Sequence, residues 1–347
     1  MERRIDAFCH ILPKRYDEAR WKRHGKTKFT EYSPAHIKKA HVGGQRQLNY
    51  EVLTDLDARF RMIEEFESYR QVLSVASPPP EIVDPDDSDE LCRILNDDLA
   101  ELVAQHPHHF AGAVANVPMN KPEQAARELE RALGDLKLNG VQLFSSVLGK
   151  PLDRPEFRPI FEIMARHDLP ILLHPTRPRT QPDYPTEDAS KYIIWQVFGW
   201  PYESTAAMTR IVFGGILEEF PDLKIIVHHT GAMIPFFSGR LQAMYTLFEP
   251  LWIEERGGLL KRPVVEYFRK FYADTSVFTA ASIECAADFF GADHVIYGTD
   301  APFDIEGGRF SVRESAKAVK DARLTEQDKQ QILHGTFERL FRVKASH

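Results

Sequence analysis

Short apolar runs alternate with longer amphipathic stretches along this chain. Eight runs of four to seven residues have the length and composition of buried strands: Ile5–Cys9, Gln71–Ala76, Phe110–Asn116, Gly140–Phe144, Pro170–Leu173, Lys224–His228, Phe271–Asp274 and His294–Tyr297. Between them lie stretches with helical spacing, including Asp87–Gln105, Pro122–Gly134, Pro155–His167, Ser204–Phe220 and Ala280–Phe290. Repeated strand–helix units pair in parallel, so the pattern predicts an α/β fold. Eight units favour a closed (β/α)8 TIM barrel, and an open doubly wound sheet is the competing arrangement.

Two long segments interrupt this alternation. The 347 residues suit one barrel, so we expect a single domain over residues 1–347 with insertions at about 11–52 and 175–200. The insertions follow the first and the fifth predicted strands. In a barrel, the loops after strands lie on the face that carries the active site, so both insertions are candidate parts of a site.

Composition and charge exclude several classes of protein. Apolar residues make up 43% of the chain and charged residues 27%, which is enough to bury a large core. The net charge of −7 argues against a broad nucleic-acid-binding surface. Three scattered cysteines, Cys9, Cys92 and Cys285, indicate neither a disulfide scaffold nor a cysteine zinc site, and they favour a reducing, cytoplasmic location. We find no signal peptide and no apolar run long enough for a membrane span.

Metal-ligand residue types follow four of the predicted strands. His10 ends the first strand, His174 follows the fifth, the pair His228 and His229 ends the sixth, and Asp300 follows the eighth. Two histidines and a carboxylate at one end of a barrel are a known set for a divalent metal with open positions. Adjacent strand residues face opposite sides, so only one of His228 and His229 is expected to enter the site.

The ordered set of motifs resembles the amidohydrolase superfamily. More narrowly, it resembles the α-amino-β-carboxymuconate-ε-semialdehyde decarboxylase family of metal-dependent, non-oxidative decarboxylases. The resemblance covers about residues 3–342. It rests on Ile5-Asp6 with His10-Ile11-Leu12-Pro13, Leu95-Asn96-Asp97-Asp98-Leu99-Ala100, Leu173-His174-Pro175, Gly214-Gly215-Ile216, Phe220-Pro221-Asp222-Leu223-Lys224, His229-Thr230-Gly231 with Pro235-Phe236, and Gly298-Thr299-Asp300 with Pro302-Phe303.

The resemblance implies a barrel that holds one divalent metal ion, most often zinc and in some members manganese. The matched ligands are His10, His174 and Asp300. His229 matches the catalytic histidine of the family, which assigns His228 a packing role against a neighbouring helix. A proton would come from His229 or from Asp300.

Two further residues match the family's substrate site. Arg240 matches an arginine that reaches the substrate carboxylate across a dimer interface, and Trp195 matches an aromatic residue of the substrate pocket. The resemblance therefore implies a homodimer or a higher homo-oligomer that binds a small carboxylate.

The first strand departs from the family pattern. The family usually carries His-x-His there, and Phe8 occupies the first of these positions. Phenylalanine cannot bind a metal ion, and Asp6 lies one strand repeat deeper, about 6.6 Å along the strand. The site would then bind metal through three protein ligands, prefer a different metal, or have lost the metal. We expect the first outcome, because the other ligand positions are present together.

These observations predict a metal-dependent non-oxidative decarboxylase of an aromatic or conjugated unsaturated acid. The alternatives are a metal-dependent hydrolase of a lactone, ester or amide, and a hydratase of an unsaturated acid. A non-catalytic binding protein is the third class, and it predicts no bound metal. Only the decarboxylase releases CO2.

Overall fold

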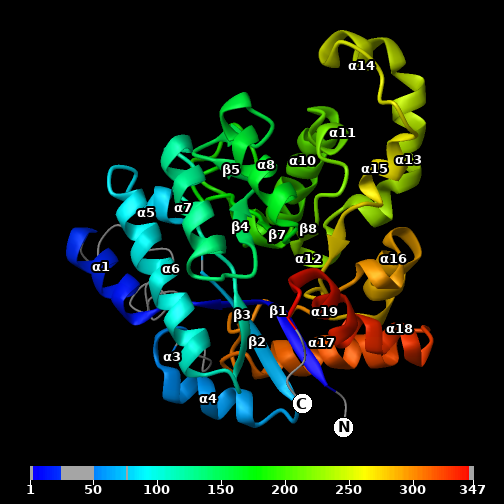
Figure 1. The fold of residues 1–347 in the computed structure, drawn as a ribbon. Coiled ribbons are helices and arrows are strands. Elements are labelled where there is room, and N and C mark those ends of the chain that lie inside the picture. Colours follow the sequence, from blue (N-terminus) through cyan, green and yellow to red (C-terminus); the bar gives the residue numbers. More distant parts are fainter. Residues whose placement is uncertain (1–2, 25–50, 76, 344–347) are drawn as a thin grey trace.

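Parallel strands form the centre of the molecule. The computed structural model describes residues 3–24, 51–75 and 77–343 (Figure 1). Two parallel sheets, with strand orders β1-β2-β3 and β4-β7-β8-β9, contain Arg4–Ile11 (β1), Tyr69–Val75 (β2), Phe110–Ala113 (β3), Val141–Phe144 (β4), Ile171–His174 (β7), Ile225–Val227 (β8) and Tyr272–Ala273 (β9). A short antiparallel hairpin, Ser146–Val147 (β5) and Lys150–Pro151 (β6), was not predicted from the sequence.

Single bridges and backbone hydrogen bonds complete the ring. A parallel bridge between Ala115 and Val141 joins β3 to β4, and one between Ala273 and Val295 joins β9 to the eighth predicted strand. That segment reaches β1 through the bond from the Ala7 N–H to the Tyr297 carbonyl, at 2.9 Å. The ring order is that of a (β/α)8 barrel, as predicted.

The eighth predicted strand, His294–Tyr297, forms no regular ladder. His294 ends a 3-10 helix, Ala292–His294 (η2), and Val295 makes only a single bridge. The neighbouring β1 is irregular between Asp6 and Cys9. This irregularity lies in the pairing of β1 with β2, and the eighth strand position is joined to β9 and β1 by isolated bonds.

Helices surround the strands. They are Lys14–His24 (α1), Glu51–Thr54 (α3), Leu56–Glu64 (α4), Pro80–Val83 (α5), Ser88–Gln105 (α6), Pro122–Gly134 (α7), Arg158–His167 (α8), Ile194–Val197 (α9), Gly199–Phe213 (α10), Ile216–Glu219 (α11), His228–Gly231 (α12), Ile234–Leu247 (α13), Glu249–Arg256 (α14), Val264–Phe268 (α15), Ala280–Phe290 (α16), Arg309–Asp321 (α17), Glu326–Gln330 (α18) and Thr336–Phe341 (α19), with a 3-10 turn at Pro155–Phe157 (η1) and a π-helix at Gln331–Gly335 (η3).

Successive residues of the strands pack alternately into two apolar clusters. Ile171, Leu173, Ile225 and Val227 pack in the larger cluster beneath the helices, whereas Leu172 and Ile226 belong to a smaller cluster inside the barrel. Phe337 and Phe341 of α19 join the smaller cluster. The period of two that defines a strand therefore decides which side chains face the barrel axis.

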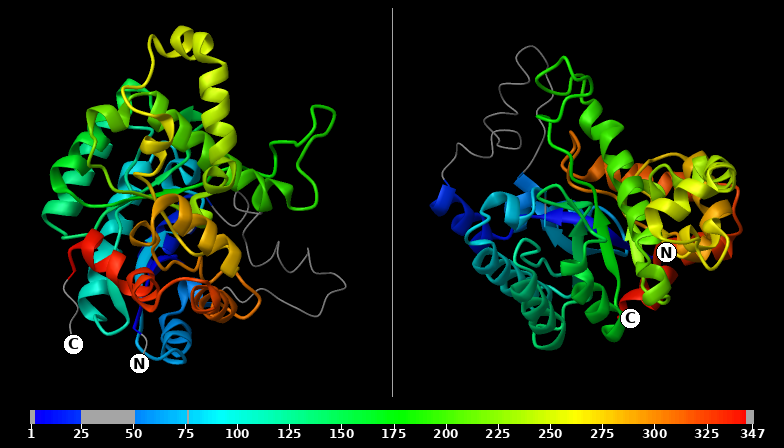
Figure 2. Two further views of the ribbon diagram at one scale, coloured as in Figure 1. Left: turned by 90° about the vertical axis from the view of Figure 1, so that its right-hand side faces the viewer. Right: turned by 90° about the horizontal axis from the view of Figure 1, so that it is seen from above.

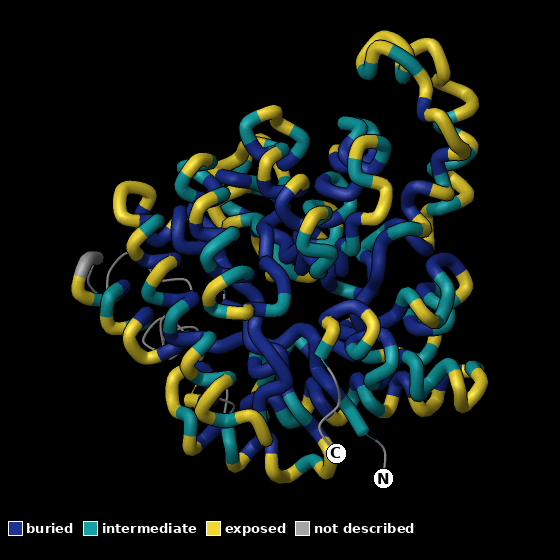
Figure 3. The backbone as a smooth tube through the Cα atoms, viewed as in Figure 1, coloured by how far each residue is buried: buried dark blue, intermediate teal, exposed yellow. Residues whose placement is uncertain are grey.

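The predicted insertions differ in form. The first contains α1, and residues 25–50 lie outside the described residues. The second runs as turns and irregular chain through residues 175–193 before α9 and α10, and it extends away from the barrel (Figure 2). Helices α13 and α14 form a separate projection (Figures 1 and 2), largely exposed in Figure 3. Within the described ranges, no helix is both long and apolar enough to cross a membrane.

Candidate metal centre

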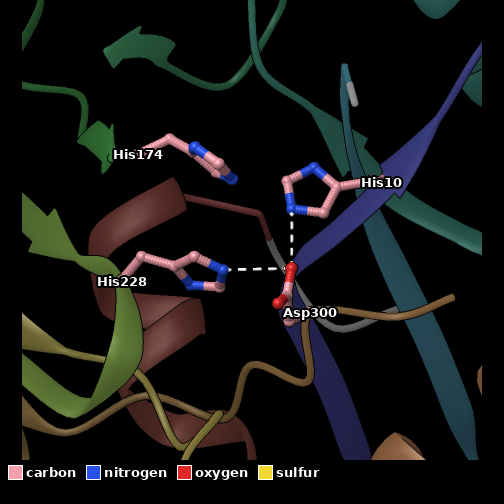
Figure 4. A group of neighbouring side chains, drawn as sticks. All are labelled: His10, His174, His228 and Asp300. Carbon is pink, nitrogen blue, oxygen red and sulfur yellow. Dashed lines mark ion pairs between the residues drawn. The ribbon is translucent and has the colours of Figure 1, made fainter. Parts of the chain in front are cut away.

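Four side chains meet where the barrel strands end. His10 comes from β1, His174 ends β7, His228 directly follows β8, and Asp300 follows the eighth strand position. One ligand atom from each lies within 4.8 Å of the others, and Figure 4 shows the imidazoles turned toward the carboxylate. The structure therefore brings together the predicted ligands His10, His174 and Asp300, and it adds His228.

The three imidazoles share one hydrogen-bonding pattern. Nδ1 of His10 lies 3.1 Å from the Val75 carbonyl oxygen, and Nδ1 of His174 lies 2.6 Å from that of Pro175. Nδ1 of His228 bonds the Asp274 carboxylate. These oxygens only accept, so each Nδ1 carries a proton and each Nε2 is directed to the other side. Outer hydrogen bonds of this kind fix the tautomer of metal-binding histidines.

Asp300 lies between two of these imidazoles. Its Oδ1 is 3.1 Å from Nε2 of His10 and 3.1 Å from Nε2 of His228. Burial raises the pKa of the Asp300 carboxyl, but the two imidazoles outweigh burial and hold that pKa well below its usual range. Burial lowers the pKa of His174, and the neighbouring imidazoles lower it further. The cluster therefore offers an ionised carboxylate beside a neutral imidazole at neutral pH.

The sequence assigns His228 to packing against a neighbouring helix, but the structure places it in the cluster. Its buried ring lies inside the cluster because its position continues the inward alternation of Ile226. Burial lowers its pKa, but the carboxylates of Asp274 and Asp300 outweigh this and raise it to about 10. Asp274, at the end of β9, was not recognised as a functional residue. The sequence signal was a carboxylate at the end of a predicted strand.

His229 lies beside the cluster rather than in it. Its ring centroid is 4.2 Å from that of His228 and 6.0 Å from that of Trp200. Among the described residues its buried Nδ1 has no hydrogen-bond partner. Burial and the charge of His228 lower its pKa to about 4. Of the pair, only His228 belongs to the four-residue cluster, whereas the resemblance gives the catalytic role to His229. His229 has φ +58°, so the chain no longer alternates here as a strand.

Phe8 occupies the same inner face as His10, as the period of two predicts. Its ring centroid is 6.0 Å from His10, and it stacks on His228 at 4.1 Å with an interplanar angle of 14°. Asp6 is fully buried and accepts bonds from the Tyr69 hydroxyl at 2.6 Å and from the hydroxyl and N–H of Thr299 at 2.5 and 3.1 Å. Its oxygens are thus already bound within the fold.

The two predicted substrate residues lie apart from the cluster. Trp195 is separated from the cluster by Trp200. The ring centroid of Trp200 is 5.4 Å from that of Trp195 and 5.7 Å from that of His174. Arg240 is exposed on α13, and within the described residues it makes no hydrogen bond or ion pair. Trp200 touches the site more directly than Trp195, and the sequence offered only its place in the long loop as a signal.

The residues present fit a divalent metal ion. Nε2 of His10 and Nε2 of His228 are buried and, among the described residues, lack a hydrogen-bond partner of acceptable geometry. Unpaired buried polar atoms are costly, so such atoms directed at one point need a ligand. Imidazole nitrogens with one carboxylate are a donor set of zinc and of other divalent transition metals.

The comparisons with known proteins give one consistent picture. The family model described as amidohydrolase matches residues 6–343. The chain is 30% identical to a gamma-resorcylate decarboxylase of Polaromonas sp. over 86% of this chain and 90% of the relative. It is 29% identical to a 2-amino-3-carboxymuconate-6-semialdehyde decarboxylase of Dictyostelium discoideum over 72% of this chain and 66% of the relative. The fold also matches a crystal structure of dihydroxybenzoic acid decarboxylase from Polaromonas sp., which holds manganese and the inhibitor 2-nitroresorcinol. The TM-score is 0.78 and the identity is 24%, over 100% of this chain and 98% of that chain.

Proposed function

Because this chain belongs to the amidohydrolase family, as its sequence predicted, we propose that it is a metal-dependent non-oxidative decarboxylase of a small aromatic carboxylic acid. The observation that carries the proposal is the convergence of the ligand atoms of His10, His174, His228 and Asp300 at the strand ends. Both relatives named above are decarboxylases, and they agree with the reaction predicted from the sequence.

The clustered side chains would hold the metal ion, and it would supply Lewis-acid chemistry toward an oxygen of the substrate. We propose zinc, because histidine nitrogens and one carboxylate suit it, and manganese is the second candidate because the Polaromonas structure holds it. The ionised form of Asp300 and the neutral form of His174, both favoured by their pKa shifts, are the forms that bind a cation.

The chain must deliver a proton to the ring carbon that bears the carboxylate. After that carbon is protonated, the bond to the carboxylate breaks, its electron pair restores the aromatic ring, and CO2 leaves. We assign the proton transfer to His229, with Asp300 as the second candidate. His229 lies next to the cluster, is not one of its four members, and has a free Nδ1. A positioned acid or base of this kind contributes about 10²–10⁴-fold to the rate.

Aromatic side chains suit a planar substrate. Trp200 and Phe144 flank His174, with ring centroids at 5.7 and 5.2 Å, and Phe303 lies 5.5 Å from His10. We place Trp195 behind Trp200 as a wall of the substrate pocket, and these rings would contact the faces of an aromatic acid.

We propose that the protein acts as a homodimer or a higher homo-oligomer. Arg240 is exposed on the projecting α13, so it is free to reach the substrate carboxylate of a neighbouring subunit. An arginine holds a carboxylate through two parallel hydrogen bonds. The three cysteines are free thiols, which supports a cytoplasmic location.

Metal content and CO2 release test the proposal together. Purified protein is analysed for zinc and manganese per chain and then incubated with 2,6-dihydroxybenzoate and related salicylates. We expect about one metal ion per chain, and one CO2 for each resorcinol formed. A metal-loaded protein that instead hydrolyses lactones or esters, without CO2, contradicts the proposal.

A further inference from the structure

The first strand gives the metal centre one ligand where its pattern has room for two. Phe8 lies at the edge of the cluster, with its ring centroid 6.0 Å from His10 and 6.3 Å from His174, and it has no atom that binds a metal ion. Asp6 does not replace it, because four bonds from Tyr69, Thr299 and the Phe8 N–H occupy its carboxylate. Any further protein ligand therefore comes from another strand.

His228 has the geometry of a ligand. Its ring is fully buried, and its Nε2 lies as close to Asp300 as that of His10, at 3.1 Å. Its Nδ1 is held by Asp274, whose carboxylate is in turn fixed by the Thr230 N–H at 2.6 Å and by the Ser276 N–H and hydroxyl at 3.1 and 3.0 Å. A carboxylate behind a histidine is the usual support of a metal-bound imidazole.

Phe8 and His228 occupy the site as a pair. The two rings lie 4.1 Å apart and nearly parallel, so Phe8 sets the plane in which the His228 imidazole lies. A phenyl ring in this contact fills the space beside His228 and supplies the flat apolar wall against which it packs.

We infer that the metal ligand missing at Phe8 has moved across the barrel to His228, so that His10, His174, His228 and Asp300 hold the ion and His229 is left for proton transfer. This rests on the metal site of the proposed function. It divides the two adjacent histidines between two tasks, and it makes Asp274 a positioning residue that fixes the His228 ring.

Adjacent substitutions provide a matched test. We compare His228→Gln with His229→Gln and measure cobalt and zinc affinity by competition with a chromophoric chelator. We expect at least a 100-fold loss of affinity for His228→Gln and less than a threefold change for His229→Gln. Asp274→Asn should weaken binding by about 10–100-fold, the range for the outer partner of a ligand. In His228→Gln, the further change Phe8→His should restore part of the affinity by returning a ligand to β1.

A spectroscopic count on the unaltered chain keeps the inference testable if the variants fold poorly. In the cobalt-loaded protein, each ligating imidazole gives one exchangeable, strongly shifted Nδ1–H proton resonance. We expect three such resonances in the wild type and in His229→Gln, and two in His228→Gln. Two resonances in the wild type, or equal metal affinity in wild type and His228→Gln, overturn the inference.

The outcomes separate this inference from the proposed reaction. Loss of metal in His228→Gln, with no CO2 from any acid tested in the wild type, supports the ligand set and contradicts the decarboxylase. CO2 release with unchanged metal affinity in His228→Gln supports the decarboxylase and contradicts the ligand set. A wild type that binds no divalent metal contradicts both.

Discussion

Two neighbouring histidines with the same side chain lie in opposite electrostatic environments. The carboxylates of Asp274 and Asp300 surround His228 and raise its pKa to about 10, whereas burial beside His228 lowers the pKa of His229 to about 4. At neutral pH His229 is therefore uncharged, whereas the two carboxylates favour a second proton on His228, which a bound metal ion would displace. Identical residues acquire different chemistry from their partners alone.

The first prediction concerns His229. We expect His229→Ala to lower kcat for CO2 release by about 10²–10⁴-fold, because the residue proposed to transfer the proton is removed. Metal content should stay at the wild-type value, since His229 is not one of the four clustered residues. Elemental analysis and CO2 release on the same preparation check both parts. Full turnover in the variant would assign the proton transfer to Asp300.

Glu81 provides a prediction on pH. Burial raises the pKa of this carboxyl from 4.5 to about 7. The folded state therefore retains its proton to higher pH than the unfolded chain does. The resulting stability is complete below pH 4.5 and is lost as the pH rises through about 7, a change on the order of 3 kcal/mol. Glu81→Gln stays neutral at every pH.

We therefore expect Glu81→Gln to exceed the wild type in free energy of unfolding at pH 8.5 by roughly 2–3 kcal/mol, and to differ little at pH 5. Urea denaturation at the two pH values measures this difference. The control is Glu162→Gln, an exposed glutamate of α8, which should show no such pH dependence. Parallel behaviour of the two variants would show that Glu81 is charged in the folded state.

Residue positions predicted part of the metal centre. His10, His174 and Asp300 follow strands, and the structure brings them together as expected. The match of His229 to the family's catalytic histidine assigns His228 to packing, and the unbroken apolar run Ile225–Val227 does not reveal which face of the strand points inward. Only the packing of Ile226 inside the barrel shows that His228 points inward too.

At the scale of elements, the turn after β8 positions both histidines. His229 and Thr230 have φ of +58° and +56°, and Gly231 has φ of +76°. Three consecutive left-handed residues are costly and persist only where the surroundings impose them. Bonds from the N–H groups of His229 and Thr230 to the Asp274 carboxylate, at 3.2 and 2.6 Å, hold this turn.

At Gly231 in this turn there is no room for a side chain. A Cβ at this position would lie 2.5 Å from Cε2 of Phe290 on α16, in a backbone conformation that already favours glycine. We expect Gly231→Ala to reduce the free energy of unfolding by about 2–4 kcal/mol and to weaken metal binding by shifting His228. Gly134→Ala is the control, because a Cβ there meets nothing within 4 Å. Equal stability of the two variants would contradict this account.

Most elements followed from their local pattern, and the exceptions have physical causes. The predicted helices Pro122–Gly134 and Ala280–Phe290 agree with α7 and α16. The predicted helix Ser204–Phe220 is instead divided between α10 and α11, because Gly215 adopts φ +80° between them. Long amphipathic segments are specified locally, whereas such a break depends on a single backbone conformation.

At the scale of the whole molecule, the alternation of strands and helices was sufficient to predict the barrel. The sequence did not predict the projection formed by α13 and α14, because apolar residues at helical spacing normally indicate burial. Here several remain exposed. Phe236, Leu247 and Leu251 are 78%, 66% and 52% exposed. An apolar surface of this kind on a projecting element is typical of a protein interface.

The last prediction is that α13 and α14 mediate the proposed dimer. We expect the double change Leu247→Asp and Leu251→Asp to raise the dimer dissociation constant by at least about 100-fold, since each buried leucine contributes about 1.5–3 kcal/mol and a twofold interface contains each one twice. Leu148→Asp, which alters a leucine 51% exposed in the turn between β5 and β6, is the control. Sedimentation velocity measures the change.

The same variant tests the role of Arg240. If this arginine completes a neighbouring subunit's site, separating the subunits should raise KM for the carboxylate while each chain keeps its metal ion. Arg240→Lys in the intact dimer should raise KM in the same direction, because lysine cannot form the paired hydrogen bonds of a guanidinium. A fully active monomer would show that all residues that bind the substrate come from one chain, and it would contradict this role of Arg240.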